Sequence, residues 1–378
     1  MSPPLSYLDY NAEAPLKPAV AEAMAAASDR VGNPSSVHRF GRLARSALED
    51  ARAQVGALAG TGPTNVIFTS GGTEANNLAL TGTAWRRRVV SAVEHDSVLA
   101  AAPDATTVAV GGDGVIDVAA LEAALAADPA PALVSIMLAN NETGVIQPVA
   151  AAAERAHAHG ALLHCDAVQG VGRIPLSLHD LGADLMSLSA HKMGGPQGAG
   201  ALVVRDGVDV SAMLHGGRQE AGRRAGSENV AALIGFGVAA DLAADDLKSS
   251  ERMSGLRDRI EAELTAAAPD ARVLGDAAPR LANTTCITMP GVAAEIQVMA
   301  LDLAGVAVSS GAACSSGKVG PSHVLAAMAV EPAVAACAVR ISLGWDSTEA
   351  DADRLIEAWT ALYRRTGRND LRRRSSTG

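Results

Sequence analysis

Aromatic side chains are scarce in this sequence: tryptophan, tyrosine and phenylalanine each occur three times and together make up 2% of 378 residues. Small aliphatic residues dominate, so the core and the buried helix faces have to be built mainly from alanine, valine and leucine. A chain of this length can bury a large core, and its length predicts two or three domains.

Cysteine is also rare, and its spacing excludes two kinds of site. The four cysteines, Cys165, Cys286, Cys314 and Cys337, form no CxxC pair. We therefore expect neither a metal site nor a redox pair. All of them except Cys314 lie in apolar segments and are interpreted as buried thiols.

The sequence also lacks an excess of positive charge and any long apolar run. Its formal net charge is −10, which argues against nucleic acid as a direct partner. No stretch is long enough to cross a bilayer, and the first residues lack the regions of a signal peptide. We therefore expect a soluble, cytoplasmic protein.

What is present is an alternation of short apolar runs with longer segments of helical periodicity. This pattern is typical of an α/β fold with a mostly parallel sheet covered by helices on both faces. The predicted strands are residues 66–69, 88–93, 133–138, 161–165, 184–189 and 199–205.

The pattern changes after a helix predicted at about residues 229–259. We predict a large domain at residues 14–255 and a smaller α+β domain made of residues 1–13 and 256–366. The basic end, residues 367–378, is predicted to be disordered.

Polar residues follow five of the predicted strands directly. Open α/β sheets bind ligands outside the carboxyl ends of their strands, so these clusters predict one common site. The clusters are residues 70–74, 94–95, 140–142, 166–169 and 189–192.

Lys192 ends the run Ser187-Leu-Ser-Ala-His-Lys, just past a predicted strand and before several glycines. A partly desolvated lysine amine loses its proton readily and can form a Schiff base. The alternative is a solvated surface charge. The Ser-x-His-Lys pattern resembles the segment that carries pyridoxal phosphate (PLP) in fold-type I enzymes.

Ser70-Gly-Gly-Thr-Glu joins a strand to a helix, so free N–H groups at the helix start can receive an anion. The segment lacks the lysine of a P-loop and the third glycine of a dinucleotide fingerprint, so a monophosphate fits better than a nucleotide. The alternative is an ordinary threonine-capped helix.

Other polar residues have both a functional and a structural interpretation. Asp166 follows a buried strand and either pairs with a cation, such as a pyridinium nitrogen, or caps a helix. Gln169 and Asn141 either bind ring substituents or serve the local structure. His95 either stacks on a flat ligand or is an ordinary polar residue.

Arg340 lies within an apolar strand, where an arginine has to be paired. A substrate carboxylate is preferred as its partner over an internal salt bridge. Ser227, in a glycine-rich loop with Arg223 and Arg224, offers a hydroxyl for phosphate. Cys314 is surrounded by small residues, and we interpret it as an accessible nucleophile rather than an incidental surface thiol.

Together these segments resemble the PLP-dependent cysteine desulfurases of the NifS/IscS type, within the class V aminotransferase group. The resemblance runs from Tyr7 to about Trp359, with the motifs in the family's order. They are Tyr-Leu-Asp-x-Asn-Ala, Asn-Pro-Ser-Ser-x-His, Gly-Gly-Thr-Glu-Ala-Asn-Asn, Asn-Asn-Glu-Thr-Gly, Asp-Ala-Val-Gln, Ser-Ala-His-Lys and Ser-Ser-Gly-x-Ala-Cys.

The resemblance implies a PLP-dependent transferase of fold type I and a role for each candidate residue. Lys192 would hold PLP and remove the substrate's Cα proton, Cys314 would take the sulfur of L-cysteine as a persulfide, and Arg340 would bind the substrate carboxylate. The implied cofactor contacts are Asp166 to the ring nitrogen, Gln169 and Asn141 beside the ring oxygen, His95 on the ring face, and Gly72, Thr73, Ser189, His191 and a partner subunit's Ser227 at the phosphate.

The implied product is L-alanine, and the implied assembly is a homodimer that passes sulfur to an acceptor protein, with an iron–sulfur scaffold as one candidate. The alternatives are another PLP lyase of this fold, such as a selenocysteine lyase, or a sulfur-relay scaffold without activity. The family's Asn-Ala-Thr-Thr-Pro reads Asn11-Ala-Glu-Ala-Pro15 here. We expect this departure to leave the cofactor site untouched, and Ser227 to replace the usual threonine without loss of its hydroxyl.

Overall fold

The computed structural model describes residues 5–310 and 321–375, with side chains described to residue 366. In this part of the chain the largest sheet has seven strands in the order β2-β8-β7-β6-β5-β3-β4. Only β8 runs antiparallel to its neighbours, which confirms the mostly parallel sheet. The strands are β2 Val66–Thr69, β3 Arg87–Ser91, β4 Thr106–Val108, β5 Ala132–Met137, β6 Leu162–Asp166, β7 Leu185–Ser189 and β8 Gly200–Val204.

The sequence analysis found all of these strands except β4. This edge strand is three residues long, and two of them are exposed. It therefore lacks the apolar run that marks the strands buried on both faces.

Consecutive residues of the inner strands contribute to different apolar cores, as a pleated strand requires. In β5, Val134 packs with the larger core and Leu133 with the smaller one; β7 divides Met186 and Leu185 in the same way. Helices α1 Pro18–Ser28, α2 Arg39–Leu58, α5 Val118–Ala127, α6 Val149–Ala158 and α7 Val230–Lys248 contribute to the first core, and α3 Gly72–Gly82 and α4 Asp96–Leu99 to the second.

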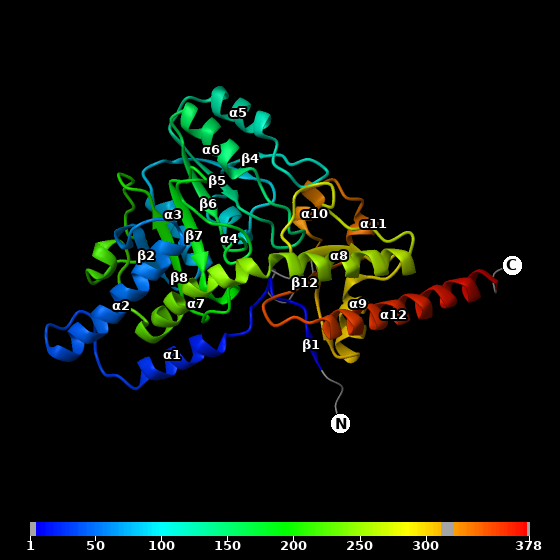
Figure 1. Cartoon of the computed structure of the whole chain (residues 1–378). Helices are drawn as coiled ribbons and strands as arrows, with labels where there is room; N and C mark the ends of the chain where they lie inside the picture. The colour runs from blue at the N-terminus through cyan, green and yellow to red at the C-terminus, as the bar shows by residue number, and fades with distance from the viewer. Residues whose placement is uncertain (1–4, 311–320, 376–378) are drawn as a thin grey trace.

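A further apolar core lies at the other end of the molecule, where Figure 1 shows α8, α9 and α12 grouped together. Leu8, Ile341 and Trp359 all belong to it. The elements around it are β1 Ser6–Tyr7, α8 Ser250–Ala267, β9 Thr284–Thr288, α9 Ala294–Leu303, β10 Val306–Ala307, β11 Ser309–Ser310, β12 Ala338–Ser342 and α12 Glu349–Ser375, with the short helices α10 His323–Ala327 and α11 Pro332–Ala335 nearby.

The N-terminal strand β1 pairs with β10, so the start of the chain lies with this second group of elements. The helix predicted at 229–259 consists of two helices, α7 and α8, which meet at Ser249. Met253 and Leu256 already pack in the further core, with Leu8, Ile341 and Trp359. The division at residue 255 stays a proposal, and these contacts favour a boundary a few residues earlier.

The disordered basic end, residues 367–378, stays a prediction. Helix α12 extends to Ser375, and no proline interrupts the segment from residue 349. Although α12 has 27 residues, none of the helices in the described ranges combines the length and the apolar character needed for crossing a bilayer.

A buried ion pair fastens the loop of residues 214–229 to the large sheet. Arg52 donates to both carboxylate oxygens of Glu220, at 2.5 and 2.8 Å, and Glu220 also accepts from the backbone N–H of Phe68 at 2.9 Å. Glu220 and Ala221 have φ angles of 47° and 56°, values that non-glycine residues rarely adopt. The ion pair offsets this backbone strain and holds the loop that carries Ser227.

We predict that Arg52→Met lowers the free energy of unfolding by about 3–5 kcal/mol, because it leaves the Glu220 carboxylate buried without its cation. Urea unfolding followed by circular dichroism measures this change. The matched control is Lys248→Met, which breaks the exposed pair between Lys248 and Asp245 and should leave the unfolding midpoint unchanged. Equal midpoints for both variants would contradict the prediction.

Candidate active site

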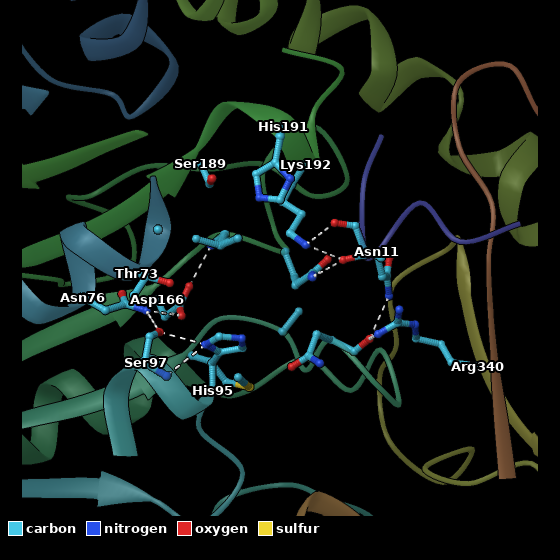
Figure 2. A pocket seen from close by; sticks show the side chains of 17 residues that line it. Asn11, Thr73, Asn76, His95, Ser97, Asp166, Ser189, His191, Lys192 and Arg340 are labelled. Carbon is cyan, nitrogen blue, oxygen red and sulfur yellow. Dashed lines mark hydrogen bonds between the residues drawn. The ribbon is translucent and has the colours of Figure 1, made fainter. Parts of the chain in front are cut away.

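The polar residues after strands β3, β5, β6 and β7 meet in one cavity at the carboxyl ends of these strands. Figure 2 shows Asp166 and Arg340 at opposite ends of this pocket, with Lys192 and Asn11 between them. Among the sequence-predicted residues, those that line it are Gly72, Thr73, His95, Asn141, Asp166, Gln169, Ser189, His191, Lys192 and Arg340.

Lys192 ends a short 3-10 helix, Ala190–Lys192, that follows β7 directly. Its Nζ donates to the carbonyl oxygens of Asn11 and Ala12, at 2.6 and 2.7 Å. The side chain is half-buried and lines the cavity, so the alternative of a solvated surface charge does not describe it.

Asn11 is a site residue that the sequence analysis missed. Its carbonyl oxygen accepts from Lys192 and also from Nε2 of Gln169 at 3.0 Å. Its own side-chain amide donates to the carbonyl oxygen of Asn141 at 3.1 Å and to Oγ1 of Thr284 at 3.0 Å. The available signal was its place in the Tyr-Leu-Asp-x-Asn-Ala motif.

Asp166 ends β6 and is buried at the base of the cavity. Its Oδ2 accepts from Nδ2 of Asn76 at 2.8 Å, and its Oδ1 accepts from the backbone N–H of Val168 at 3.0 Å. Asn76 also donates to Oγ of Ser97, which lies 2.8 Å from Nδ1 of His95. This chain links the carboxylate to the predicted stacking histidine through Asn76 and Ser97, which the sequence analysis did not single out.

A second carboxyl group, Glu94, lies close to Asp166. Burial, together with the negative charge of Asp166, raises the pKa of Glu94 well above its ordinary value. Its Oε1 accepts from the backbone N–H of Met137 at 2.6 Å, while Oε2 has no partner among the described residues. Burial and the neighbouring carboxylate therefore favour the neutral form of Glu94 over the charged form.

One part of the pocket, which we call the anion cradle, continues into an adjoining cavity. The cradle is formed by Gly71, Gly72, Thr73, Ser189 and His191. Gly71 precedes α3 with φ 156° and ψ −177°, a conformation largely restricted to glycine. The first N–H groups of α3 have no partner within the helix. Oγ of Ser189 is buried without a hydrogen bond to any described residue.

The cradle fits a phosphate group, which is the part of PLP that the sequence analysis predicted here. A buried hydroxyl without a partner is costly unless a ligand supplies one. Helix N–H groups and a hydroxyl are the donors that an anion requires. The residues present therefore suit PLP, with its phosphate in the cradle and its ring towards Asp166.

The expectation that Glu13 leaves the cofactor site untouched was wrong. Its Oε2 lies 2.7 Å from Nδ1 of His191, and Glu13 lines the cavity that continues from the cradle. The error has a simple reason: the N-terminal segment crosses the edge of the large sheet, where the backbone N–H of Ala14 donates to the carbonyl oxygen of His191 at 2.9 Å.

Arg340 reaches the pocket from β12 and is 1% exposed. Its Nη2 donates to Oδ1 of Asp9 at 2.7 Å, and its Nη1 donates to the carbonyl oxygen of Asn141 at 3.1 Å. The internal salt bridge, which the sequence analysis ranked second, is thus present. Nε has no partner among the described residues, so the guanidinium keeps a donor for a further ligand.

Two predicted residues do not line this pocket in the described chain. Ser227 lies exposed in the loop fastened by Glu220. Cys314 lies in the segment 311–320, outside the described residues. The residues that flank this segment lie beside the site, because Ser309 pairs with Arg340 and Ser322 donates to Oε2 of Glu142 at 2.6 Å.

The sequence of this chain is similar to a known family and to proteins of that family. Residues 6–355 match the family "Aminotransferase class-V". A relative described as "Cysteine desulfurase" from Cereibacter sphaeroides is 46% identical over 366 residues, which cover 93% of this chain and 94% of the relative.

Solved structures resemble the chain over nearly the same length. The X-ray structure of a NifS-like protein from Rickettsia africae has a TM-score of 0.89 at 36% identity and covers 95% of this chain and 99% of its own. The structure titled "SspA in complex with cysteine" has a TM-score of 0.78 at 29% identity, with 90% and 99% covered.

Proposed function

The chain belongs to the aminotransferase class-V family and is a PLP-dependent cysteine desulfurase, and we propose that Lys192 holds the cofactor while Cys314 accepts the sulfur. The observation that carries this assignment of residues is that the Lys192 amine, the buried carboxylate of Asp166 and residues of the anion cradle line one cavity. The substrate is L-cysteine and the carbon product is L-alanine.

When bound, PLP supplies an electron sink next to the reacting carbon of the substrate. The carboxylate of Asp166 holds a proton on the ring nitrogen, and the Asn76–Ser97–His95 chain fixes the orientation of that carboxylate. Nε2 of Gln169 faces the same carbonyl oxygen as the Lys192 amine and is a donor for the ring oxygen, with Asn141 beside it.

Lys192 moves the proton of the reaction. Two backbone carbonyl oxygens hold its Nζ at the centre of the pocket, within reach of a substrate between Arg340 and the ring. Nζ removes the proton from Cα of L-cysteine, as a general base in contact with its substrate can.

Arg340 binds the substrate carboxylate in this proposal. Its guanidinium is buried, and in the structure Asp9 accepts one of its N–H groups. An incoming carboxylate competes with Asp9 for the same planar fork, and Nε, which has no partner among the described residues, supplies an additional donor. Asp9 therefore keeps the arginine oriented while the site is empty of substrate.

The thiolate of Cys314 attacks the sulfur of L-cysteine. A sulfur–sulfur bond forms, and the carbon–sulfur bond breaks with its electron pair left on Cβ of the substrate. Cβ takes up the proton that the Cys314 thiol released, and Lys192 returns a proton to Cα, which completes L-alanine. The persulfide on Cys314 then passes its sulfur to an acceptor protein, for which an iron–sulfur cluster scaffold is one candidate. A cytoplasmic location also belongs to this proposal and rests on the composition of the chain.

We further propose a homodimer in which Ser227 of one subunit binds the phosphate in the partner's cradle. This serine is exposed, and it lies outside the lining of its own chain's pocket. Its loop is held in a strained conformation by the Arg52–Glu220 pair, which would present a hydroxyl at a defined position to a second subunit.

Lys192→Ala should give a colourless protein, because the amine that bonds PLP is gone, whereas the wild-type protein is yellow. The absorption spectrum of each purified protein tests this. Lys17→Ala is the control: this lysine pairs with Asp246 at 2.6 Å, away from the lining of the main pocket, and its removal should preserve the colour. A colourless wild type would overturn the proposal.

Cys314→Ala should keep the yellow colour but release no sulfide from L-cysteine in the presence of a reductant, because the sulfur has no acceptor on the enzyme. Cys337→Ala serves as the matched control and should retain full activity. Sulfide release at the wild-type rate by the Cys314 variant would favour another PLP lyase of this fold. A yellow wild type without any turnover would favour the sulfur-relay scaffold.

Subunit mixing tests the role of Ser227. Ser227→Glu places a charge against the phosphate and should abolish PLP binding, as Lys192→Ala abolishes colour. A mixed dimer of the two variants contains one site of two with both Lys192 and the partner's Ser227 intact, so the mixed dimer, co-expressed with two different tags and purified on both, should show about half of the wild-type visible absorbance. No restored absorbance, or a monomer in sedimentation velocity, would contradict the dimer proposal.

A further inference from the structure

An acidic residue lies at the edge of the site proposed for phosphate, where two negative charges would repel each other. Glu13 lines the cavity that continues from the anion cradle, together with Ser189 and His191. A carboxylate beside a bound phosphate is repulsive unless a cation separates the two charges. The contacts of Glu13 show which group can do so.

Glu13 is held against His191 from the N-terminal segment. Its Oε2 lies 2.7 Å from Nδ1 of the imidazole, and the side chains of Glu13 and His191 are 35% and 27% exposed. The hydroxyl of Tyr7 donates to the backbone carbonyl oxygen of Glu13 at 2.9 Å, so the segment that carries the carboxylate is itself fastened. The pair is therefore a built contact rather than a chance meeting of two mobile side chains.

The hydrogen bond determines which nitrogen of His191 serves the cradle. A carboxylate accepts, so the Nδ1 atom has to carry a proton. The Nε2 atom is then the nitrogen left for a ligand in the cavity that the imidazole lines. Figure 2 shows His191 beside Ser189, above the amine of Lys192.

The charges around His191 oppose one another. Burial and the positive charge of Lys192 lower the pKa of His191, while the hydrogen bond and charge of Glu13 act to raise it. Across the same cavity, Glu74 is paired with Arg224 at 2.8 Å and is thereby largely compensated. Glu13 is the acidic group in direct contact with the imidazole.

We propose that Glu13 is a positioning residue of the phosphate site: its carboxylate holds the Nδ1 proton of His191, so that Nε2 carries the second proton and donates to the phosphate of bound PLP. The neutral imidazole takes up one proton when the phosphate dianion binds. The arrangement then alternates in charge, with carboxylate, imidazolium and phosphate in a row. This inference rests on the proposed function only in placing the phosphate of PLP in the cradle.

Repulsion and stabilisation by Glu13 predict opposite changes in the affinity for PLP when its charge is removed. If Glu13 merely repelled the phosphate, removing its charge would tighten PLP binding. If Glu13 stabilises the imidazolium, removing its charge weakens PLP binding and leaves pyridoxal, which has no phosphate, unaffected. Pyridoxal also reacts with Lys192, so protonation of the lysine weakens the binding of both aldehydes equally. The ratio of the affinity for PLP to the affinity for pyridoxal therefore reports on the phosphate site alone.

The test uses the full-length protein, freed of cofactor with hydroxylamine and titrated with PLP or pyridoxal while visible absorption is followed. Glu13→Gln preserves the size of the side chain without its charge, and Glu13→Ala removes it. Both variants should bind PLP at least about tenfold more weakly at neutral pH, the loss of about one charge-assisted hydrogen bond, with pyridoxal binding unchanged.

The same ratio should depend on pH. Because the complex holds one more proton than the separated partners, the preference for PLP over pyridoxal falls as the pH rises. In Glu13→Gln this fall should begin at lower pH, since the imidazolium has lost its counter-charge.

Three results would overturn the inference while wild-type PLP binding still supports the proposed function. They are unchanged or tighter PLP binding by both variants, an equal loss for PLP and pyridoxal, and a PLP-to-pyridoxal ratio that does not vary with pH. Failure of the wild-type protein itself to bind PLP would instead refute the proposed function.

Discussion

Parallel pairing of β5, β6 and β7 is the constraint on which the site depends. Met137 pairs with Asp166, and Asp166 pairs with Ser187, so the strands end at nearly the same level. Residues that follow these strands must then lie at one edge of the sheet. This register brings Asp166, at the end of β6, close to Lys192, in the turn that follows β7 directly.

The N-terminal segment connects this edge to strands β9 and β12 of the smaller group of elements. Asn11 hydrogen-bonds Thr284 through its side chain, and its backbone N–H donates to Oγ of Ser342 at 3.0 Å. Its carbonyl oxygen meanwhile accepts from Lys192 and Gln169. Glu13, two residues further on, reaches the anion cradle in the same way. A movement of β9 and β12 would therefore shift Asn11, and with it the carbonyl oxygen that accepts from the Lys192 amine.

Several polar groups at the pocket keep unused hydrogen-bonding capacity. Oγ of Ser189 and Nε of Arg340 are both buried without a described partner, at the phosphate side and at the substrate side respectively. Native proteins satisfy nearly all such groups. Other buried groups of the described chain also lack a partner, but these two lie at the two ends of one cavity, where a ligand that spans it would supply one.

Local sequence patterns were enough to predict the α/β fold, all the long strands and the convergence of the strand-end residues, because apolar runs mark strands buried on both faces and parallel strands share one ligand-binding edge. These patterns could not show three contacts: the hydrogen bond from Lys192 to the carbonyl oxygen of Asn11, the salt bridge between Asp9 and Arg340, and the hydrogen bond between Glu13 and His191. These contacts join residues 178 to 331 positions apart, and no local periodicity carries that information. These polar groups are partners because, in the folded chain, the N-terminal segment crosses the edge of the large sheet and contacts the residues that follow β7.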